Sequence, residues 1–424
     1  MIRFLLKGIL RDRNRSLLPI LVVTIGVTLT VFAFCYFNGT MGDIVEFTAK
    51  YSAGHVKIMT RAYEENKNQM PNDLALTGVG ELLDNLHNDY PKMEFVERIN
   101  FGGLLDAPDD NGETKKQGVV IGLAADLISE NSKELERLNL EGSLRKGRFP
   151  EKPDEVLLSD SFADKLEVGP GDQVTLISST MYGGMSIQNF TVAGTIEFGV
   201  QMMDRSGMIA DIAGIRSALD MVDATSEILG FFKGSGYDDI KAMNVETTFN
   251  EKYTNPNDEY SPVMTRLRNE GFLAGYWDLI QSFIGILITV FIVTMSIVLW
   301  NTGLIGGLRR YGEIGVRLAI GEEKGHIYRS MILEAFLIGI IGSTLGTLFG
   351  LGFSYWMQEV GINVGELMKN SKMMMPSVFR AQITSPAYYL GFIPGVFSVV
   401  LGTALSGVGI YKRKTASLFK ELEN

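Results

Sequence analysis

The sequence predicts an α-helical integral membrane protein with four transmembrane helices and a large mixed α/β extracytoplasmic domain inserted between helices 1 and 2. Three observations support this fold class. Long apolar runs recur along the chain, short Lys/Arg clusters flank them, and about 240 residues of ordinary globular character separate the first run from the second. A chain of 424 residues, 46% of them hydrophobic, has room for more than one domain and is not typical of a soluble enzyme.

The second apolar run gives the direction of the chain. Residues 279–300 contain Gln281 as their only strongly polar side chain, and at about 1.5 Å of rise per residue such a run crosses a hydrocarbon core of about 30 Å. The loop after it is short and rich in Lys and Arg, which places this loop on the cytoplasmic side. The remaining predicted spans cover residues 17–37, about 331–356 and about 388–411.

The basic clusters set the orientation of all four spans. Arg and Lys precede the first run and follow the last one, so both termini are predicted in the cytoplasm and the large domain on the other side of the cell membrane. A cleaved signal peptide is the alternative for the first run, but the run is too long and no small-x-small site follows it. The predicted domains are residues 1–40, 41–276 and 277–424.

The external segment reads as an acidic, mixed α/β domain. Residues 38–278 hold 40 of the 49 acids but only 22 of the 39 basic residues, and Cys35 is the sole cysteine, so burial alone must stabilise the domain. Helical spacing over 41–52 predicts a stalk that continues the first span, and 260–276 is expected to form the second stalk. The other predicted elements are strands at 55–59, 96–106, 117–123, 155–158, 173–177 and 228–232, a long strand ending near 198, and helices at 159–166 and around 213–221.

Motifs for chemistry are missing from the sequence. It contains no phosphate-binding G-x-x-x-x-G-K-[ST] loop, no hydrolase or dinucleotide motif, and three isolated histidines without a paired cysteine. We therefore expect no catalytic residue, no metal site and no cofactor in this chain. The acidic balance also argues against a nucleic-acid partner.

The predicted cytosolic turn is the constellation most indicative of function. Residues 308–320 form an amphipathic pattern in which Tyr311, Ile314 and Leu318 share one helical face, and Glu313 and Arg317 stand four apart in the order that favours an ion pair. We expect a short helix across the membrane exit. An interfacial helix held at lipid headgroups is the alternative, but acids interspersed among its bases favour a protein partner.

The run from Arg310 to Gly321, followed by Glu334, resembles the FtsX/MacB-type ABC transporter permeases, whose pattern is approximately R-x-x-E-I-G-x-x-R-A-x-G then L-x-E-A. Segment 142–219 is similar to the periplasmic core domain of the same family. The resemblance implies an ATPase-coupling site on the cytosolic turn, a second permease copy or paralogue, and ATP and magnesium bound by a separate ABC ATPase subunit. The implied coupling residues are Arg310, Tyr311, Glu313, Ile314, Arg317 and Gly321.

The resemblance leaves three functions open. The layout and the segment Ser52–Ile58 are closest to the LolC/LolE lipoprotein-releasing permeases, which favours release of lipoproteins from the inner membrane, with a periplasmic lipoprotein chaperone or adaptor as partner. A MacB-like efflux permease for small molecules or peptides and an FtsX-like regulator of an envelope hydrolase are the alternatives. Fold analogy does not decide between them.

Two apolar regions are candidate contact sites. The hairpin tip at Met181, Tyr182 and Met185 is a candidate periplasmic partner contact, with an ordinary exposed turn as the alternative. A candidate cargo cleft near the outer membrane surface is predicted, with interfacial anchoring in the bilayer as the alternative. Its residues are Leu273, Tyr276, Trp277, Ile280, Met373, Met374 and Met375. A row of glycines at 342, 346 and 350 predicts close helix packing, within or between chains.

Overall fold

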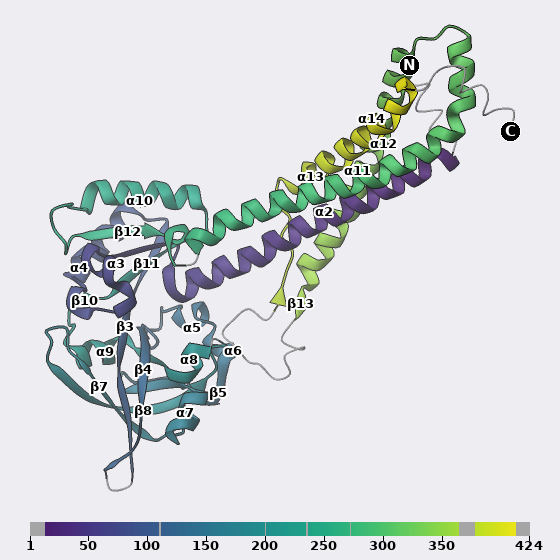
Figure 1. The fold of residues 1–424 in the computed structure, drawn as a ribbon. Coiled ribbons are helices and arrows are strands. Elements are labelled where there is room, and N and C mark those ends of the chain that lie inside the picture. The colour runs from purple at the N-terminus through teal and green to yellow at the C-terminus, as the bar shows by residue number, and fades with distance from the viewer. Residues whose placement is uncertain are drawn as a thin grey trace. The chain divides into compact units, whose positions relative to one another are not determined.

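The computed structural model describes residues 13–109, 112–199, 201–234, 236–271, 273–363 and 378–412, with some side chains inside these ranges left undescribed. The chain divides into two compact units. One contains the long apolar helices and the other comprises the external domain, residues 43–276 together with 363–378. Each unit is described separately below (Figure 1).

Four long helices belong wholly or largely to the first unit. They are α2 (Arg13–Thr48), α11 (Leu273–Ala319), α12 (Lys324–Val360) and α14 (Phe392–Lys412), with the short α13 (Ala387–Leu390) before the last. Among the described residues, three helical stretches are long and apolar enough to cross a membrane: Ser16–Ala53, Lys324–Val360 and Ala387–Gly407. The fourth predicted span lies in α11, where the described apolar stretch Gly285–Asn301 is shorter, so the count of four spans stays a prediction.

Helix α11 corrects one expectation. The predicted short helix over 308–320 is not a separate element, because α11 continues without a helical break from Leu273 to Ala319. No proline lies between the apolar run and the basic segment. The helix is therefore not interrupted there by a residue that lacks a backbone N–H. The chain reverses only at Gly321, after which α12 begins at Lys324.

The glycine row packs within the chain. A Cβ added to Gly342, Gly346 or Gly350 of α12 would lie 2.8, 2.6 or 2.8 Å from the Cβ of Val23, Val27 or Val31 of α2, respectively. The side chains of Thr24 and Thr28 of α2 also donate hydrogen bonds to the carbonyls of Gly342 and Gly346, at 3.4 and 3.2 Å. Small residues spaced four apart allow two helix backbones to approach closely. The interface of α2 with α12 therefore rests on this row.

The external domain is built on one mixed ten-stranded sheet, as the predicted mixed α/β class requires. Its strand order is β12-β1-β11-β3-β4-β9-β6-β8-β5, and β7 pairs with β3 and β8. The strands of this sheet are β1 (Val56–Thr60), β3 (Met93–Pro108), β4 (Thr114–Ala125), β5 (Leu144–Gly147), β6 (Glu155–Ser159), β7 (Gln173–Ser179), β8 (Met185–Ile196), β9 (Gly207–Asp211), β11 (Glu227–Phe232) and β12 (Pro262–Arg266). Two small sheets contain β2 (Leu76–Thr77) with β10 (Ala224–Thr225), and β13 (Ile362–Asn363) with β14 (Val378–Phe379).

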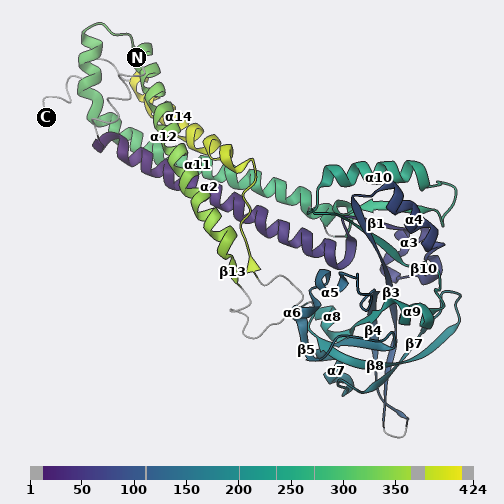
Figure 2. The same cartoon turned by 180° about the vertical axis from the view of Figure 1, so that it is seen from behind.

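Short helices cover the faces of this sheet. They are η1 (Ala49–Ala53, a π-helix), α3 (Arg61–Asn66), η2 (Lys67–Gln69), η3 (Asn72–Leu74), α4 (Val79–Asp89), α5 (Glu134–Arg137), α6 (Leu140–Ser143), α7 (Asp160–Leu166), α8 (Gln201–Ser206), α9 (Ile212–Leu219), α10 (Asp239–Tyr253) and η4 (Leu267–Asn269). Helix α10 lies along β12 in both ribbon views (Figures 1 and 2) and buries Phe249 in a core with Ile58 and Met264. Helices α7 and α9 contribute Phe162 and Ile215 to the largest core.

The predicted elements of this domain are confirmed where sequence patterns were local. The hydroxyl of Ser159 accepts the backbone N–H of Phe162 at 3.0 Å and caps α7, as predicted. The second stalk is wrong in its bounds, because the return segment first forms β12 and η4 and becomes helical only at Leu273. Strand β12 forms because β1 offers it a pairing edge, which the sequence of the return segment cannot show.

Candidate functional site

The turn between α11 and α12 is closed by a defined helix-ending motif. The N–H of Glu322 donates to the carbonyl of Arg317 at 3.0 Å and the N–H of Gly321 to that of Leu318 at 3.1 Å, the two bonds of a Schellman motif. Gly321 has a φ of +97°, a conformation that side chains rarely adopt. The glycine of the predicted coupling pattern is thus required by the turn itself.

Arg317 and Glu322 form a two-pronged ion pair across this turn. Arg317 Nε and Nη2 each lie 2.6 Å from a carboxylate oxygen of Glu322, and hydrogen bonding by the guanidinium lowers the pKa of Glu322. The side chains of Arg310, Tyr311, Glu313 and Ile314 lie outside the described residues, so the predicted pair of Glu313 with Arg317 stays a prediction.

The turn also presents apolar residues that the sequence patterns did not single out. Leu318, predicted to share one helical face with Tyr311 and Ile314, packs against the fully buried Ile327 of α12. Val316 and Ile320 are exposed, and Ile320 is 81% exposed. A protein partner can bury this exposed isoleucine, which lies beside the ion pair. The helical periodicity of the sequence did not distinguish Ile320 from other apolar residues.

The external sheet carries an apolar row on its outer face. Strand register places Val119 of β4 opposite Leu104 of β3, Leu104 opposite Ile177 of β7, and Ile177 opposite Ile187 of β8. Paired residues of antiparallel strands point to the same face. Val119 and Ile187 are 67% and 63% exposed, and the other two are half-buried. We call these four residues the outer apolar row.

The predicted partner contact at the hairpin tip is partly corrected. Tyr182 and Met185, at the β7–β8 turn, are each 77% exposed and extend the apolar surface beyond the row. Met181 is buried in the main core instead, and its N–H donates to the carbonyl of Leu219 at 2.8 Å. A residue in the turn after a strand can still point inward when a helix such as α9 lies beside it, which the turn pattern does not reveal.

The predicted cargo cleft has little support among the described residues. Leu273 is 1% exposed and therefore lines no open cleft. The side chains of Tyr276, Trp277 and Ile280 and the residues Met373, Met374 and Met375 lie outside the described part.

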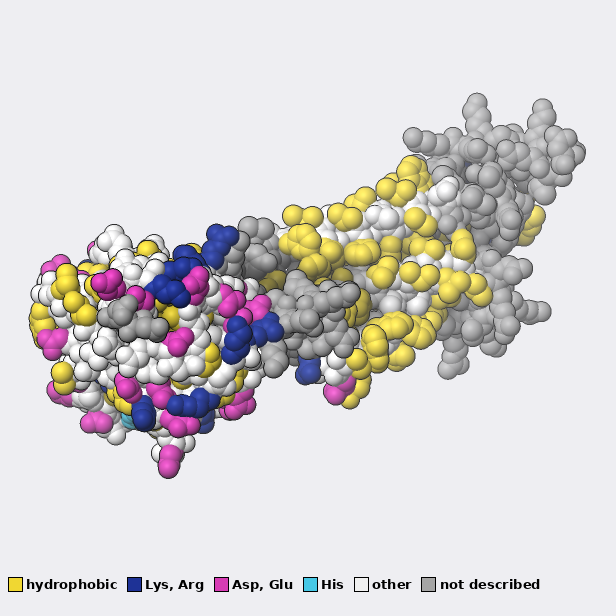
Figure 3. Space-filling view, turned by 90° about the horizontal axis from the view of Figure 1, so that it is seen from below, with side chains coloured by type: hydrophobic (Ala, Val, Ile, Leu, Met, Phe, Trp, Pro, Cys, Tyr) yellow, Lys and Arg dark blue, Asp and Glu magenta, His cyan; other side chains and the backbone are white. Residues whose placement is uncertain are grey.

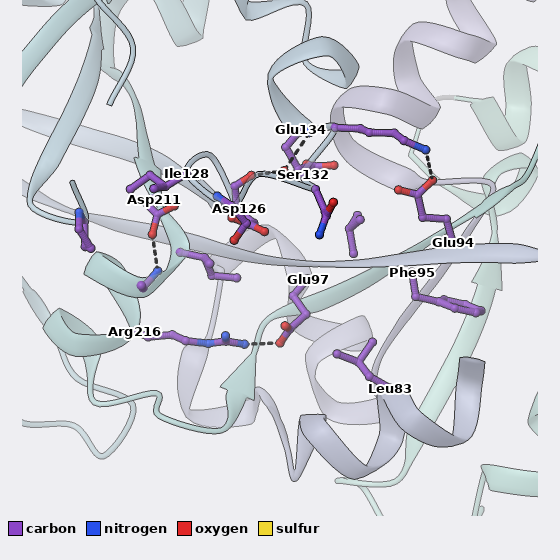
Figure 4. A pocket seen from close by; sticks show the side chains of 17 residues that line it. Leu83, Glu94, Phe95, Glu97, Asp126, Ile128, Ser132, Glu134, Asp211 and Arg216 are labelled. Atoms are coloured by element: carbon purple, nitrogen blue, oxygen red, sulfur yellow. Dashed lines mark hydrogen bonds and ion pairs between the residues drawn. The ribbon is translucent and has the colours of Figure 1, made fainter. Parts of the chain in front are cut away.

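A cavity of about 540 Å³ beside β3 has the wrong lining for acyl chains. Ion pairs of Arg216 with Glu97 and of Lys133 with Glu94 cross its walls, and Asp211 accepts the N–H of Ala213 at 2.9 Å (Figure 4). Hydrocarbon gains nothing from burial against paired charges. This cavity is therefore not a replacement for the predicted cleft.

Apolar side chains gather over the long helices, whereas charged side chains are scattered over the external domain (Figure 3). Long apolar helices with a large α/β domain inserted after the first of them are the layout of an integral membrane protein. Two family models match the chain: "MacB-like periplasmic core domain" over residues 16–232 and "FtsX-like permease C-terminal" over residues 285–415. The chain belongs to the FtsX/MacB-type ABC transporter permease family.

Several curated relatives share short segments with this chain. A macrolide export ATP-binding/permease protein MacB from Bordetella avium is 25% identical over 26% of this chain and 17% of the relative. A MacB 1/2 protein from Paracoccus denitrificans is 30% identical over 25% of this chain and 15% of the relative. The Bartonella quintana MacB is 43% identical over 12% of this chain and 8% of the relative. The matches thus span less than a fifth of these relatives' lengths.

A comparison with solved structures found a similar protein of known structure. The periplasmic region of MacB from Actinobacillus actinomycetemcomitans gives a TM-score of 0.32 at 8% identity, covering 50% of this chain and 89% of that chain. A likeness at this level supports no argument about this protein. The family assignment rests on the two family models.

Proposed function

We propose that this chain transmits movement from a separate ATPase to its external domain, and through that domain to a partner outside the membrane. The pairing of the domain's first and last strands carries the proposal. β1 follows α2 and η1, β12 precedes η4 and α11, and the two strands form an antiparallel ladder from Val56 opposite Arg266 to Thr60 opposite Pro262. Two long helices thus lead into adjacent strands of one sheet.

An ion network strengthens the junction of these strands. Lys57 of β1 lies 3.2 Å from a carboxylate oxygen of Glu227 and 3.7 Å from one of Glu270, and Glu270 also pairs with Lys67 at 3.2 Å. Burial raises the pKa of Glu270, but Lys57, Lys67 and the hydrogen bond from the Thr265 hydroxyl together outweigh it, so the pKa lies below its usual range. The network ties β1 to Glu270 at the end of η4, so a displacement that reaches one of the two segments would be shared by the other.

The partner ATPase would bind the cytosolic turn through Arg317, Glu322 and the exposed Ile320. In this proposal ATP and magnesium are bound by that subunit. Two permease copies, or this chain with a paralogue, would complete the assembly. The outer apolar row, with Tyr182 and Met185, supplies the surface for a periplasmic adaptor, since exposed apolar patches mark interaction sites.

For cargo we propose a small molecule or peptide passed outward, because the curated relatives are named macrolide export proteins. Lipoprotein release is the second candidate, supported by the segment Ser52–Ile58 and weakened by the burial of Leu273. The chain can be purified with its native partners, and co-purified proteins and ligands identified by mass spectrometry.

An ATPase of the ABC class is expected among the co-purified proteins, and its absence would contradict the proposed function. Lipid-modified proteins that leave the complex on ATP addition would favour the second candidate. A small molecule or peptide that leaves in the same way would support the first.

A further inference from the structure

Arg98 of β3 reaches the end of the first long helix from inside the external domain. Its Nη2 donates to the backbone carbonyl of Lys50 at 2.7 Å, and its Nη1 donates to the carbonyl of Tyr51. Its Nε donates to a carboxylate oxygen of Glu134 at 3.0 Å. One guanidinium thus joins η1, β3 and α5, and Arg98 is 1% exposed.

These two carbonyls lie in the last residues of the helix. The last carbonyls of any helix lack a partner along their own chain. Here the helix ends in the π-helix η1, where Gly54 N–H serves the carbonyl of Ala49 at 2.8 Å. The next N–H, of His55, donates to Gly230 of β11 at 2.8 Å instead. Arg98 therefore supplies donors at a helix end, where the backbone offers few.

A second arginine fixes the position of Glu134. Arg137 pairs with Glu134 and, at 3.1 Å, with Glu94 of β3. Its guanidinium carbon lies 4.3 Å from the ring centre of Phe231. The side chains of Arg98, Glu134 and Arg137 are all at least nine-tenths buried. These contacts hold the guanidinium group of Arg98 in one orientation. A planar guanidinium forms several directed hydrogen bonds at once only when its orientation is fixed.

Strand β3 connects this joint to the outer apolar row. Leu104 of the row lies six residues along the same strand, roughly 20 Å at the rise of a β-strand. Between the two residues β3 is paired with β4 from Ile99 onward, while β11 pairs with it up to Arg98 and β7 from Leu104, so a displacement of β3 is shared with β4 along this length. We propose that Arg98 is a positioning residue that ties the end of the first helix to β3 and so passes helix displacement to the outer apolar row. This inference rests on the proposed function.

The proposal can be tested by hydrogen–deuterium exchange on the full chain with its partner ATPase in lipid nanodiscs, without nucleotide and after vanadate trapping. The test variant is Arg98→Met with Glu134→Leu, which removes the pair without leaving a lone buried charge. The control is Arg148→Met with Glu155→Leu, which removes another ion pair of the same domain. In that pair Nη1 and Nη2 of Arg148 lie 2.8 and 2.6 Å from the carboxylate oxygens of Glu155, and the pair contacts neither long helix.

In the unmodified complex, trapping should change exchange both in residues 43–53 and in β3 and its neighbours. In the test variant the change should persist in 43–53 and disappear from 99–108, while the control behaves as the unmodified complex. Amides of 53–55 should also exchange about tenfold faster in the test variant, the size expected from losing charge-assisted hydrogen bonds.

Responses in 99–108 that are the same in the test variant and the control would overturn the role of Arg98 and leave the proposed function standing. An unmodified complex that responds in neither segment would overturn the proposed function, and the joint with it. If the double variant does not fold, Arg98→Lys keeps the charge but not the fork. A reduced response in 99–108 for this variant supports the joint, and an unchanged one overturns it.

Discussion

Substituting Gly346 tests the packing of α2 against α12 most directly. A Cβ at this position would lie 2.6 Å from the Cβ of Val27 and 2.7 Å from the backbone carbonyl oxygen of Thr24. Both distances are far below van der Waals contact, and a backbone atom cannot rotate away. The helices must therefore separate when Gly346→Ala is made.

Gly352, on the same helix, is the matched control. Apart from the backbone of its own helix turn, no atom of the described residues lies within 4 Å of a Cβ added there. The exchange of Gly for Ala within a helix stabilises by up to about 1 kcal/mol in water, and overpacking costs about 1–3 kcal/mol. Gly352→Ala should therefore be neutral or slightly stabilising. Gly346→Ala should be less stable than Gly352→Ala by roughly 1–3 kcal/mol, the overpacking cost that the control does not have.

The free energy of unfolding can be measured by titrating the purified chain with SDS in mixed micelles and following tryptophan fluorescence. The chain contains three tryptophans, none of which is substituted in these variants. If Gly346→Ala is as stable as Gly352→Ala, the close approach of α2 and α12 through the glycine row is refuted. Gly346→Leu should enlarge the loss further, and a gain in stability would refute the same reasoning.

Three further predictions concern other parts of the chain. Burial lowers the pKa of His55 from its ordinary 6.5 to about 4, so stability present above pH 6.5 is lost as the pH falls toward 4, by on the order of 2–3 kcal/mol. Pulse proteolysis at pH 7.5 and 5 should show this loss in the unmodified chain and a smaller one in His55→Asn; equal losses would contradict it. In a Cys35→Ala background, Asn257→Cys should react with an impermeant thiol reagent in intact spheroplasts and Glu322→Cys should not; labelling at the second position would reverse the predicted topology. Arg317→Ala should leave the membrane assembly intact but weaken co-purification of the ATPase, and full ATPase binding with full transport would remove the coupling role.

Some elements of the external domain escaped prediction because their stability comes from tertiary contacts. Helix α10 has only Ala242 and Phe249 buried among its 15 residues, too few for a helical apolar stripe. It is held by packing on β12 and by the carboxylate of Asp238, which accepts the N–H of Ile240 at 3.1 Å and that of Lys241 at 3.2 Å. Strand β9 lies in the middle of the sheet, and all five of its residues are buried. Its sequence therefore lacks the alternation of apolar and polar residues by which a half-exposed strand is predicted.

The candidate sites divide in the same way. The coupling pattern at 310–321 was visible because turn chemistry and ion-pair spacing are local, and Gly321 occupies the position that a Schellman motif needs. The outer apolar row was invisible because its members come from four strands that only register brings together. Met181 and Leu273 were assigned to exposed sites from apolar character alone, which does not say to which side a side chain points.

The sequence by itself determined the apolar runs, the basic segments beside them, the inserted acidic domain and the turn motif, because each is specified by residues within a few positions of one another. Tertiary structure alone decided which surface the glycine row covers, where the sheet exposes apolar side chains, and which buried cation holds the end of the first helix. Arg98 and Lys50 are 48 positions apart. Such contacts depend on how distant strands pair, and the free energy that selects one pairing comes from burial of the whole core rather than from any local pattern.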